Sequence, residues 1–235
     1  MEGVKGLFFD VGGTVFDWKN TDRENIQKLA DEKGESIDSE AFANAWRGEM
    51  FKVHTQVRQG NLPWLTSDDM HLQALANMAT DYPLLNQIDN ASLVVSTWHH
   101  LKPFDGAPEA IDRLRTKYTV VVLTILSWES IVNSSKRAQV QWDGILSCEF
   151  LGYYKPSLQA YLKATRLLGL KPSEAMMVAA HEGDLVAAQA AGLHTAYVNV
   201  PEEDNMAEGF EQPDDSNFDI EAQDFDGLCR KLGVY

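Results

Sequence analysis

The chain has 235 residues, 44% of them hydrophobic, and a formal net charge of −15. The apolar fraction is enough for a hydrophobic core, and the length fits one large domain or a core domain with an insertion. The negative charge argues against nucleic acid and anionic membranes as partners, because their phosphates would repel the protein. A small anionic substrate would therefore need a local pocket of arginine, lysine and N–H groups.

The cysteines and the apolar stretches bear on cellular location. Cys148 and Cys229 lie far apart and match no metal-ligand spacing, so we expect reduced thiols in a cytoplasmic protein. The first residues lack the basic, apolar and small-residue pattern of a signal peptide. The longest apolar stretch, residues 118–126, is too short to span a bilayer.

The first predicted element is an apolar run from Val4 to Phe9, which leads into Asp10 and a turn with Gly12 and Gly13. Such a run is typical of a buried strand in a parallel sheet, and ligands bind beyond the carboxyl ends of these strands. The glycine N–H groups can approach an anion, and a carboxylate beside such donors stays ionised, as a nucleophile must. The simpler interpretation is an aspartate that only starts a turn.

Residues 17–101 are predicted to be entirely helical. Ser39 opens the longest helix, on which Trp46 belongs to the apolar stripe and Arg47 to the neighbouring face. The predicted helices cover residues 22–33, 39–59, 67–78 and 91–101.

From Pro103 onwards, helices alternate with short apolar strands, which is typical of a doubly wound α/β sheet. The predicted strands are residues 119–126, 144–150, 175–180 and 195–200. The predicted helices are residues 107–117, 130–139, 157–168 and 185–191. The acidic stretch 202–219 is predicted to be an exposed loop, with an edge strand over 218–220 and a closing helix over 225–232. We therefore expect an α/β core domain of residues 1–16 and 102–235, with residues 17–101 inserted after the first strand as a helical cap domain.

Four predicted elements end at one rim of this sheet, at Asp10, Ser127, Lys155 and Asp184. Because the carboxyl ends of parallel strands are neighbours, these side chains should converge. A lysine beside Asp10 would keep it ionised, and Asp184 would align that lysine or a water. Each residue also has a simpler interpretation, with Ser127 and Asp184 as helix N-caps and Lys155 as a solvated surface lysine.

Three further polar residues are candidates. His181 and Glu182 precede Asp184 in the same loop, where they can contact a water or stay exposed to solvent. Arg47 lies on a helix face that can look down on Asp10, and it is equally interpretable as a surface arginine in a helical ion pair.

Together these residues resemble the haloacid dehalogenase superfamily over nearly the whole chain. Asp10 with Gly13 and Thr14 matches the first motif of that superfamily, while Ser127, Lys155 and Asp184 match the second, third and fourth motifs in order. The resemblance implies a HAD-like Rossmannoid parallel sheet with an all-helical C1-type cap. Members often form dimers, so a homodimer is a further expectation.

Within the superfamily, the chain is most similar to the type II 2-haloacid dehalogenases. Gly12 stands where phosphatases carry a second aspartate, and Ala180 stands where they carry a Mg²⁺-binding carboxylate. A halide needs no proton to leave, so the resemblance implies metal-independent hydrolysis of short 2-haloalkanoic acids, without a cofactor. One alternative is a Mg²⁺-dependent phosphatase that uses Asp10, Asp184 and Glu182. Another is an inactive member that binds a small carboxylate or a protein partner.

The resemblance also implies roles for individual residues. Asp10 would attack the carbon that bears the halogen and form an ester, and Arg47 would receive the departing halide. In the well-studied dehalogenases an asparagine follows the serine of the second motif, and here it is Trp128, whose indole N–H can substitute as a donor. The implied catalytic residues are Asp10, Arg47, Ser127, Lys155 and Asp184. The implied substrate-binding residues are Val11, Gly12, Thr14, Trp64, Trp128, His181 and Glu182.

Overall fold

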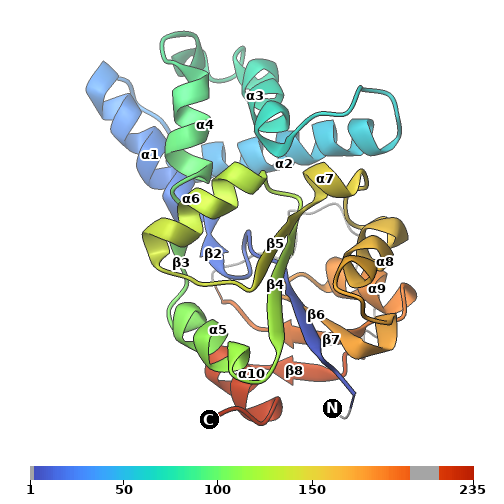
Figure 1. Ribbon diagram of the computed structural model, residues 1–235. Helices are drawn as coiled ribbons and strands as arrows, with labels where there is room; N and C mark the ends of the chain where they lie inside the picture. Colours follow the sequence, from blue (N-terminus) through green and yellow to red (C-terminus); the bar gives the residue numbers. More distant parts are fainter. Residues whose placement is uncertain (1–2, 202–216) are drawn as a thin grey trace.

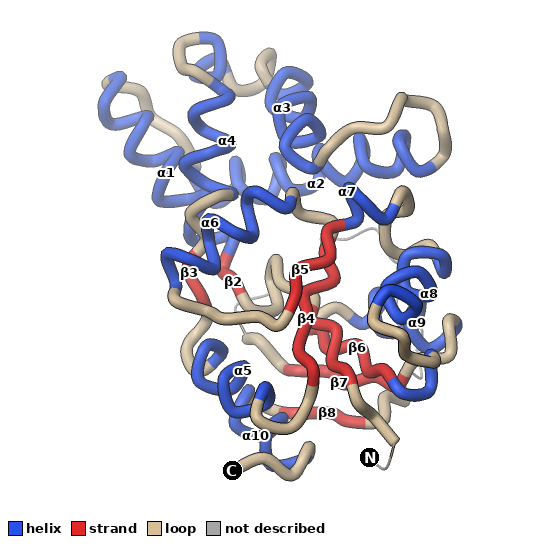
Figure 2. The backbone as a smooth tube through the Cα atoms, viewed as in Figure 1, coloured by secondary structure: helices blue, strands red, loops and turns tan. Residues whose placement is uncertain are grey.

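A computed structural model describes residues 3–201 and 217–235 of the protein. A layer of helices built from the inserted segment lies over one edge of an α/β unit, and the C-terminus lies at the opposite end (Figure 1). The tube in Figure 2 shows the strands together in the α/β unit, with helices packed around them. The mixed α/β architecture predicted from the alternating pattern is therefore confirmed.

The main sheet has six parallel strands in the order β5-β4-β1-β6-β7-β8. Strand β1 lies inside the sheet, between β4 and β6, and its four residues are all buried. The strands are β1 (Gly6–Phe9), β4 (Thr119–Thr124), β5 (Gly144–Ser147), β6 (Ala175–Ala179), β7 (His194–Val198) and β8 (Ile220–Ala222).

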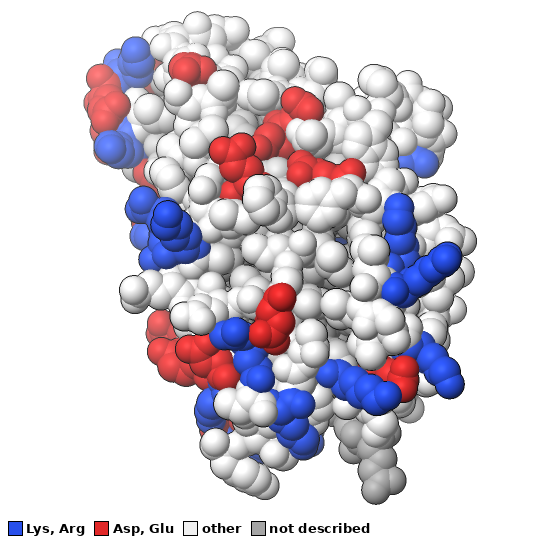
Figure 3. All heavy atoms as spheres, in the orientation of Figure 1, with Lys and Arg blue, Asp and Glu red and all other residues white. Residues whose placement is uncertain are grey.

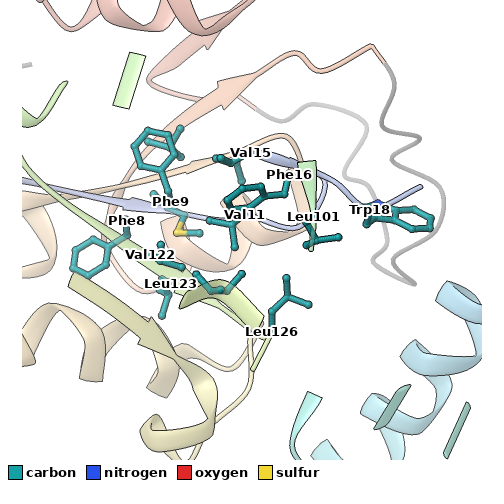
Figure 4. Packing of buried hydrophobic residues seen from close by; sticks show 14 of the residues in the cluster. Phe8, Phe9, Val11, Val15, Phe16, Trp18, Leu101, Val122, Leu123 and Leu126 are labelled. Carbon is teal, nitrogen blue, oxygen red and sulfur yellow. The ribbon is translucent and has the colours of Figure 1, made fainter. Parts of the chain in front are cut away.

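The first strand fixes where Asp10 lies. Phe9 is in register with Val122 of β4 and with Val178 of β6, and the Asp10 N–H donates to the Val178 carbonyl at 3.0 Å. Neighbouring side chains of a strand alternate between its two faces, so Phe8 and Phe9 pack into opposite halves of the core (Figure 4). Asp10 therefore leaves the sheet at the carboxyl end of a central strand.

The inserted segment forms a helical layer that is joined to the core by a two-stranded antiparallel ribbon. This ribbon pairs Phe16 with Pro103, so the chain leaves and re-enters the core at one place. Side-chain caps begin these helices: Asp17 and Asp38 accept backbone N–H groups, and Thr66 forms a capping box with Asp69. The elements are β2 (Phe16–Asp17), α1 (Trp18–Lys33), α2 (Ser39–Arg58), α3 (Ser67–Met78), η1 (Pro83–Asn86), α4 (Asn90–Trp98) and β3 (Lys102–Pro103).

The remaining helices lead from one strand to the next, except the last one, which follows the final strand. Parallel neighbours need such crossovers, because a tight turn can join only antiparallel strands. These helices are α5 (Ala107–Arg115), α6 (Trp128–Ala138), α7 (Cys148–Leu151), α8 (Leu158–Leu167), η2 (Pro172–Glu174), α9 (Glu182–Ala190) and α10 (Phe225–Lys231).

The structure differs from the sequence-based elements in several places. The strand predicted over 144–150 ends at Ser147, because the Ser147 hydroxyl accepts the Glu149 N–H at 3.2 Å and starts α7. The first helix of the insert begins at Trp18 rather than at residue 22, since Asp17 caps it. The edge strand covers 220–222 rather than 218–220. Most of the predicted acidic loop, residues 202–216, lies outside the described residues.

Two whole-molecule features bear on the earlier expectations. Both cysteines are free and buried. Across residues 3–201 and 217–235, no helix is both long enough and apolar enough to cross a membrane. On the face shown in Figure 3, acidic side chains gather where the helical layer meets the core, and basic side chains lie near α8.

Candidate active site

Three charged side chains meet at the carboxyl edge of the sheet. The Lys155 ammonium lies 2.8 Å from Asp10 Oδ1 and 2.5 Å from Asp184 Oδ2. Asp10 follows β1, Lys155 lies in the loop between α7 and α8, and Asp184 lies in the first turn of α9. All three are at least 94% buried. Charges so deeply buried are stable only in contact with one another, so the trio is a single electrostatic unit.

The second oxygen of Asp10 has its own donors. The Thr14 hydroxyl donates to Asp10 Oδ2 at 2.9 Å, and His181 Nδ1 lies 3.0 Å from the same oxygen. Because an ionised carboxylate can only accept, Nδ1 must carry the proton in this contact. Thr14 is held in turn by the Ala180 N–H, which donates to its hydroxyl at 3.0 Å. The orientation of the Asp10 carboxylate is thereby fixed from both sides.

The electrostatics favour an ionised Asp10. Burial by itself raises the pKa of this carboxyl, but the Lys155 charge and the His181 hydrogen bond outweigh burial and hold the pKa well below its usual range. For Asp184, burial and the nearby Asp10 charge raise the pKa despite the contact with Lys155. Burial lowers the pKa of Lys155, but the two carboxylates outweigh it and raise the pKa above its ordinary value. Of the two carboxylates, Asp10 is therefore the one placed to act as an anionic nucleophile.

Tyr161 is a member of the site that the sequence analysis missed. It lies on α8, is fully buried, and donates its hydroxyl proton to Asp184 Oδ1. Burial and the Asp184 charge raise the pKa of Tyr161 well above its ordinary value, so the hydroxyl stays protonated. A tyrosine in the inward stripe of the helix after Lys155 was the available signal, because a buried phenol needs a hydrogen-bond partner.

The helical layer contributes Arg47 to the same site. A small cavity of about 30 Å³ is lined by Asp10 and Lys155 from the core and by Arg47 from α2. Arg47 is 2% exposed, so its charged head is not directed to bulk solvent. Its guanidinium carbon lies 4.6 Å from the ring centre of Trp18 and 4.8 Å from that of Phe51, which are cation–π distances. The aromatic rings therefore hold a positive charge across the cavity from Asp10.

Asp22 is a second buried carboxyl close to Arg47. It is fully buried, and within the described part of the chain neither of its oxygens has a hydrogen-bond partner. Burial raises the pKa of Asp22 well above its ordinary value, despite the opposing Arg47 charge. Burial therefore favours the uncharged form of Asp22, which leaves the positive charge of Arg47 available to the cavity.

The rest of the cavity wall is less polar. Ile125 and Leu126, directly after β4, and Phe51 form its apolar side, while Gly12 and His181 lie on the core side. His54, which also lines the cavity from α2, lies on the same helix face as Arg47 but was not among the predicted site residues. At Gly12, a Cβ atom would lie 3.2 Å from Leu126 Cδ1, so a side chain there would crowd the wall.

Other residues proposed from the sequence lie elsewhere. Ser127 is the N-cap of α6, and its hydroxyl accepts the Ser130 N–H at 3.1 Å. The backbone N–H of Trp128 donates to Glu149, and its side chain is half exposed. Trp64 is also half exposed and stacks on Tyr154 at 4.5 Å. In the described part of the chain these three do not line the cavity, and neither do Val11, Thr14 and Glu182.

The donor set does not fit a Mg²⁺ ion. Mg²⁺ requires near-octahedral oxygen coordination, usually with several retained waters. Here the Lys155 ammonium lies between the two carboxylates. Among residues 3–201 and 217–235 there is no group of three or more His, Cys, Asp or Glu side chains that could hold a metal ion.

Comparison with known proteins shows which family the chain belongs to. The family model of haloacid dehalogenase-like hydrolases matches residues 4–192. The chain belongs to this family. The resemblance inferred from the four sequence motifs is thus confirmed.

Relatives within the haloacid dehalogenase-like hydrolases have different activities. The crystal structure of an L-2-haloacid dehalogenase superposes with a TM-score of 0.85 at 31% identity, covering 98% of this chain and 99% of that one. The (S)-2-haloacid dehalogenase of Pseudomonas fluorescens is 22% identical, covering 85% of this chain and 86% of the relative. The glyceraldehyde 3-phosphate phosphatase of Methanothermobacter thermautotrophicus is 24% identical, covering 83% and 86% respectively. Family membership therefore indicates a hydrolase and leaves the bond that is broken to be argued from the site.

Proposed function

We propose that this hydrolase removes halide from short 2-haloalkanoic acids through an ester on Asp10, without a metal ion. The observation that carries the proposal is the Asp10 carboxylate, held by Lys155 and His181, at a cavity of about 30 Å³ that Arg47 lines from the helical layer. A cavity of this size suits a compact anion, and the cationic side chains offset the strong negative charge of the protein. The helical insert then acts as a cap domain, residues 17–101, over a core of residues 1–16 and 102–235.

In the first step, an Asp10 oxygen attacks carbon 2 of the substrate, a C–O bond forms, and the halide leaves with the electrons of the carbon–halogen bond. No proton is transferred, so the absence of an acid at Gly12 is no obstacle. The substrate carboxylate is assigned to the core side of the cavity, near the backbone of Gly12. Arg47 attracts the negative charge that develops on the halogen, from the opposite side of the cavity.

In the second step, a water attacks the carbonyl carbon of the Asp10 ester, and the acyl C–O bond breaks. The products are the 2-hydroxy acid and regenerated Asp10, with one proton released overall. Asp184 and His181 are the candidate bases that take a proton from this water, because both lie at the site. Asp184 contacts Lys155, and His181 contacts Asp10. Lys155 balances the charge of Asp10 whenever the ester is absent.

The second candidate is a phosphatase of the same family, which the likeness to the archaeal phosphatase favours. It would need an acid for the leaving alkoxide and a metal ion for the phosphate. Gly12 and the Lys155 contacts do not provide these.

A single turnover of 2-chloropropionate in ¹⁸O-labelled water, with EDTA present, tests the proposal. We expect chloride release in EDTA and one heavy oxygen in the peptide that contains Asp10, because water attacks the carbonyl of the ester. Asp10→Asn is the matched control and should release no chloride. Label only in the product, or p-nitrophenyl phosphate hydrolysis that EDTA abolishes, would overturn the ester mechanism.

A further inference from the structure

We propose that His54 contacts the departing halide and thereby sets which leaving groups the enzyme accepts. This inference rests on the proposed function, which it deepens by assigning a second halide contact beside Arg47.

The placement of His54 follows from helix geometry. Residues spaced by four and then three positions lie on one face of a helix, and Arg47, Phe51 and His54 have this spacing on α2. All three line the cavity that also contains Asp10. Arg47, Phe51 and His54 therefore face the cavity from successive turns of α2, with His54 about two turns beyond Arg47.

Two aromatic rings hold the His54 ring in place, but one of its ring nitrogens has no hydrogen-bond partner among the described residues. The ring packs edge-on against Tyr154 at 5.1 Å and against Phe51 at 5.9 Å. Its side chain is almost fully buried, and Nε2 has no hydrogen-bond partner within the described residues. Buried polar atoms normally have a partner, and His54 lines the cavity, so a ligand bound in that cavity would supply one.

The surroundings of His54 identify the charge of that ligand. Burial, together with the positive charges of Arg58, Lys155 and Arg47, lowers the pKa of His54 to about 3, so the imidazole is neutral at physiological pH. A neutral imidazole has one N–H donor and adds no further positive charge. Arg47 lines the same cavity from the same helix face as His54, so the ligand that completes the site on this side is an anion. In the proposed reaction the anion formed opposite Asp10 is the halide.

A hydrogen bond from His54 would act mainly while the carbon–halogen bond breaks. The halogen then takes the bonding electrons, and a fixed donor stabilises the growing negative charge without reorganisation. Chloride concentrates its charge more than bromide does, so it gains more from the donor. His54 should therefore matter more for chlorinated than for brominated substrates.

The test compares kcat/KM for 2-chloropropionate and 2-bromopropionate in three variants. His54→Phe keeps the ring and removes the donor, and it should lower kcat/KM for the chloro compound about 10- to 100-fold, the range for hydrogen bonds to charged groups. The bromo compound should lose clearly less. His54→Gln restores an N–H donor and should recover part of the loss.

His71→Phe is the matched control, because His71 is an equally buried histidine of the same helical layer that does not line the cavity. It should leave the chloro-to-bromo ratio unchanged. If His54→Phe lowers both substrates by the same factor, His54 is structural and the proposal is overturned.

A second measurement does not depend on turnover. In crystals soaked in sodium bromide, we expect an anomalous peak within hydrogen-bond distance of a His54 ring nitrogen in the wild-type protein. The peak should be lost in His54→Phe. A cavity without bromide, or a peak that His54→Phe leaves in place, would overturn the assignment. Failure of the proposed function would show differently, as a wild-type enzyme that releases no halide.

Discussion

The charge network of the site makes a quantitative prediction about Lys155. Replacing Lys155 by Met keeps most of the buried volume but removes the cation that contacts both Asp10 and Asp184. Breaking a buried ion pair by removing one partner costs about 3–5 kcal/mol. Lys155 is 5% exposed, so solvent screening gives little relief. We expect Lys155→Met to lower the free energy of unfolding by about 3 kcal/mol at pH 8 and to abolish halide release.

The pH dependence of this loss provides the sharper check. In the wild type, the pKa of Asp10 lies below its unfolded value of 3.8, so its stabilisation is fully present from pH 5 to pH 8. Without Lys155, burial and mutual repulsion raise the carboxyl pKa values above the unfolded value. The folded variant then binds protons more readily than the unfolded chain, and its stability increases as the pH falls. The difference from wild type should therefore shrink between pH 8 and pH 5.

Urea unfolding at pH 5, 6.5 and 8 measures this difference. Lys136→Met, at an exposed position on α6, is the control and should change the unfolding free energy by less than about 0.5 kcal/mol. A Lys155→Met loss below about 1 kcal/mol, or one that is equal at all three pH values, would refute the reasoning that Lys155 neutralises two buried carboxylates.

Two further predictions concern other polar contacts. Tyr161→Phe removes the donor to Asp184 and should lower the unfolding free energy by about 1.5–3 kcal/mol, the range for hydrogen bonds to charged groups; an unchanged urea midpoint would contradict the contact. Asp68 lies 2.9 Å from His99 Nε2, and its hydrogen bond raises the pKa of His99. A raised histidine pKa stabilises the fold below the unfolded pKa of 6.5 and loses this effect as the pH rises through the folded value. Asp68→Asn should thus lower the free energy of unfolding by about 1 kcal/mol at pH 6 and have little effect at pH 9. Thermal unfolding at the two pH values measures this, and an equal effect at both would argue against a charged His99–Asp68 pair.

The sequence alone determined the architecture of the α/β unit. The buried residues Gly6–Phe9 are typical of a central strand in a parallel sheet, and the alternation after Pro103 supplies the crossover helices. Because the carboxyl ends of such strands share one edge, the convergence of Asp10, Lys155 and Asp184 could be predicted from their positions along the chain. These are local patterns combined with a topological rule, so they need no knowledge of packing.

Only the tertiary structure decided which side chains complete the site. Tyr161 belongs to a helix far from Asp10 in the sequence, and nothing local to it specifies that it contacts Asp184. The helical spacing places His54 on the face of Arg47, but only the packing of α2 against the core shows that this face lines the cavity. Trp128 was predicted to bind the substrate from its place in a motif, yet its side chain is half exposed and does not line the cavity. The helical layer packs on the core through long-range contacts such as the stacking of Trp64 on Tyr154. Helices and strands depend mainly on residues that are close in the sequence. The shape and lining of a cavity depend on packing between segments that are far apart in the sequence.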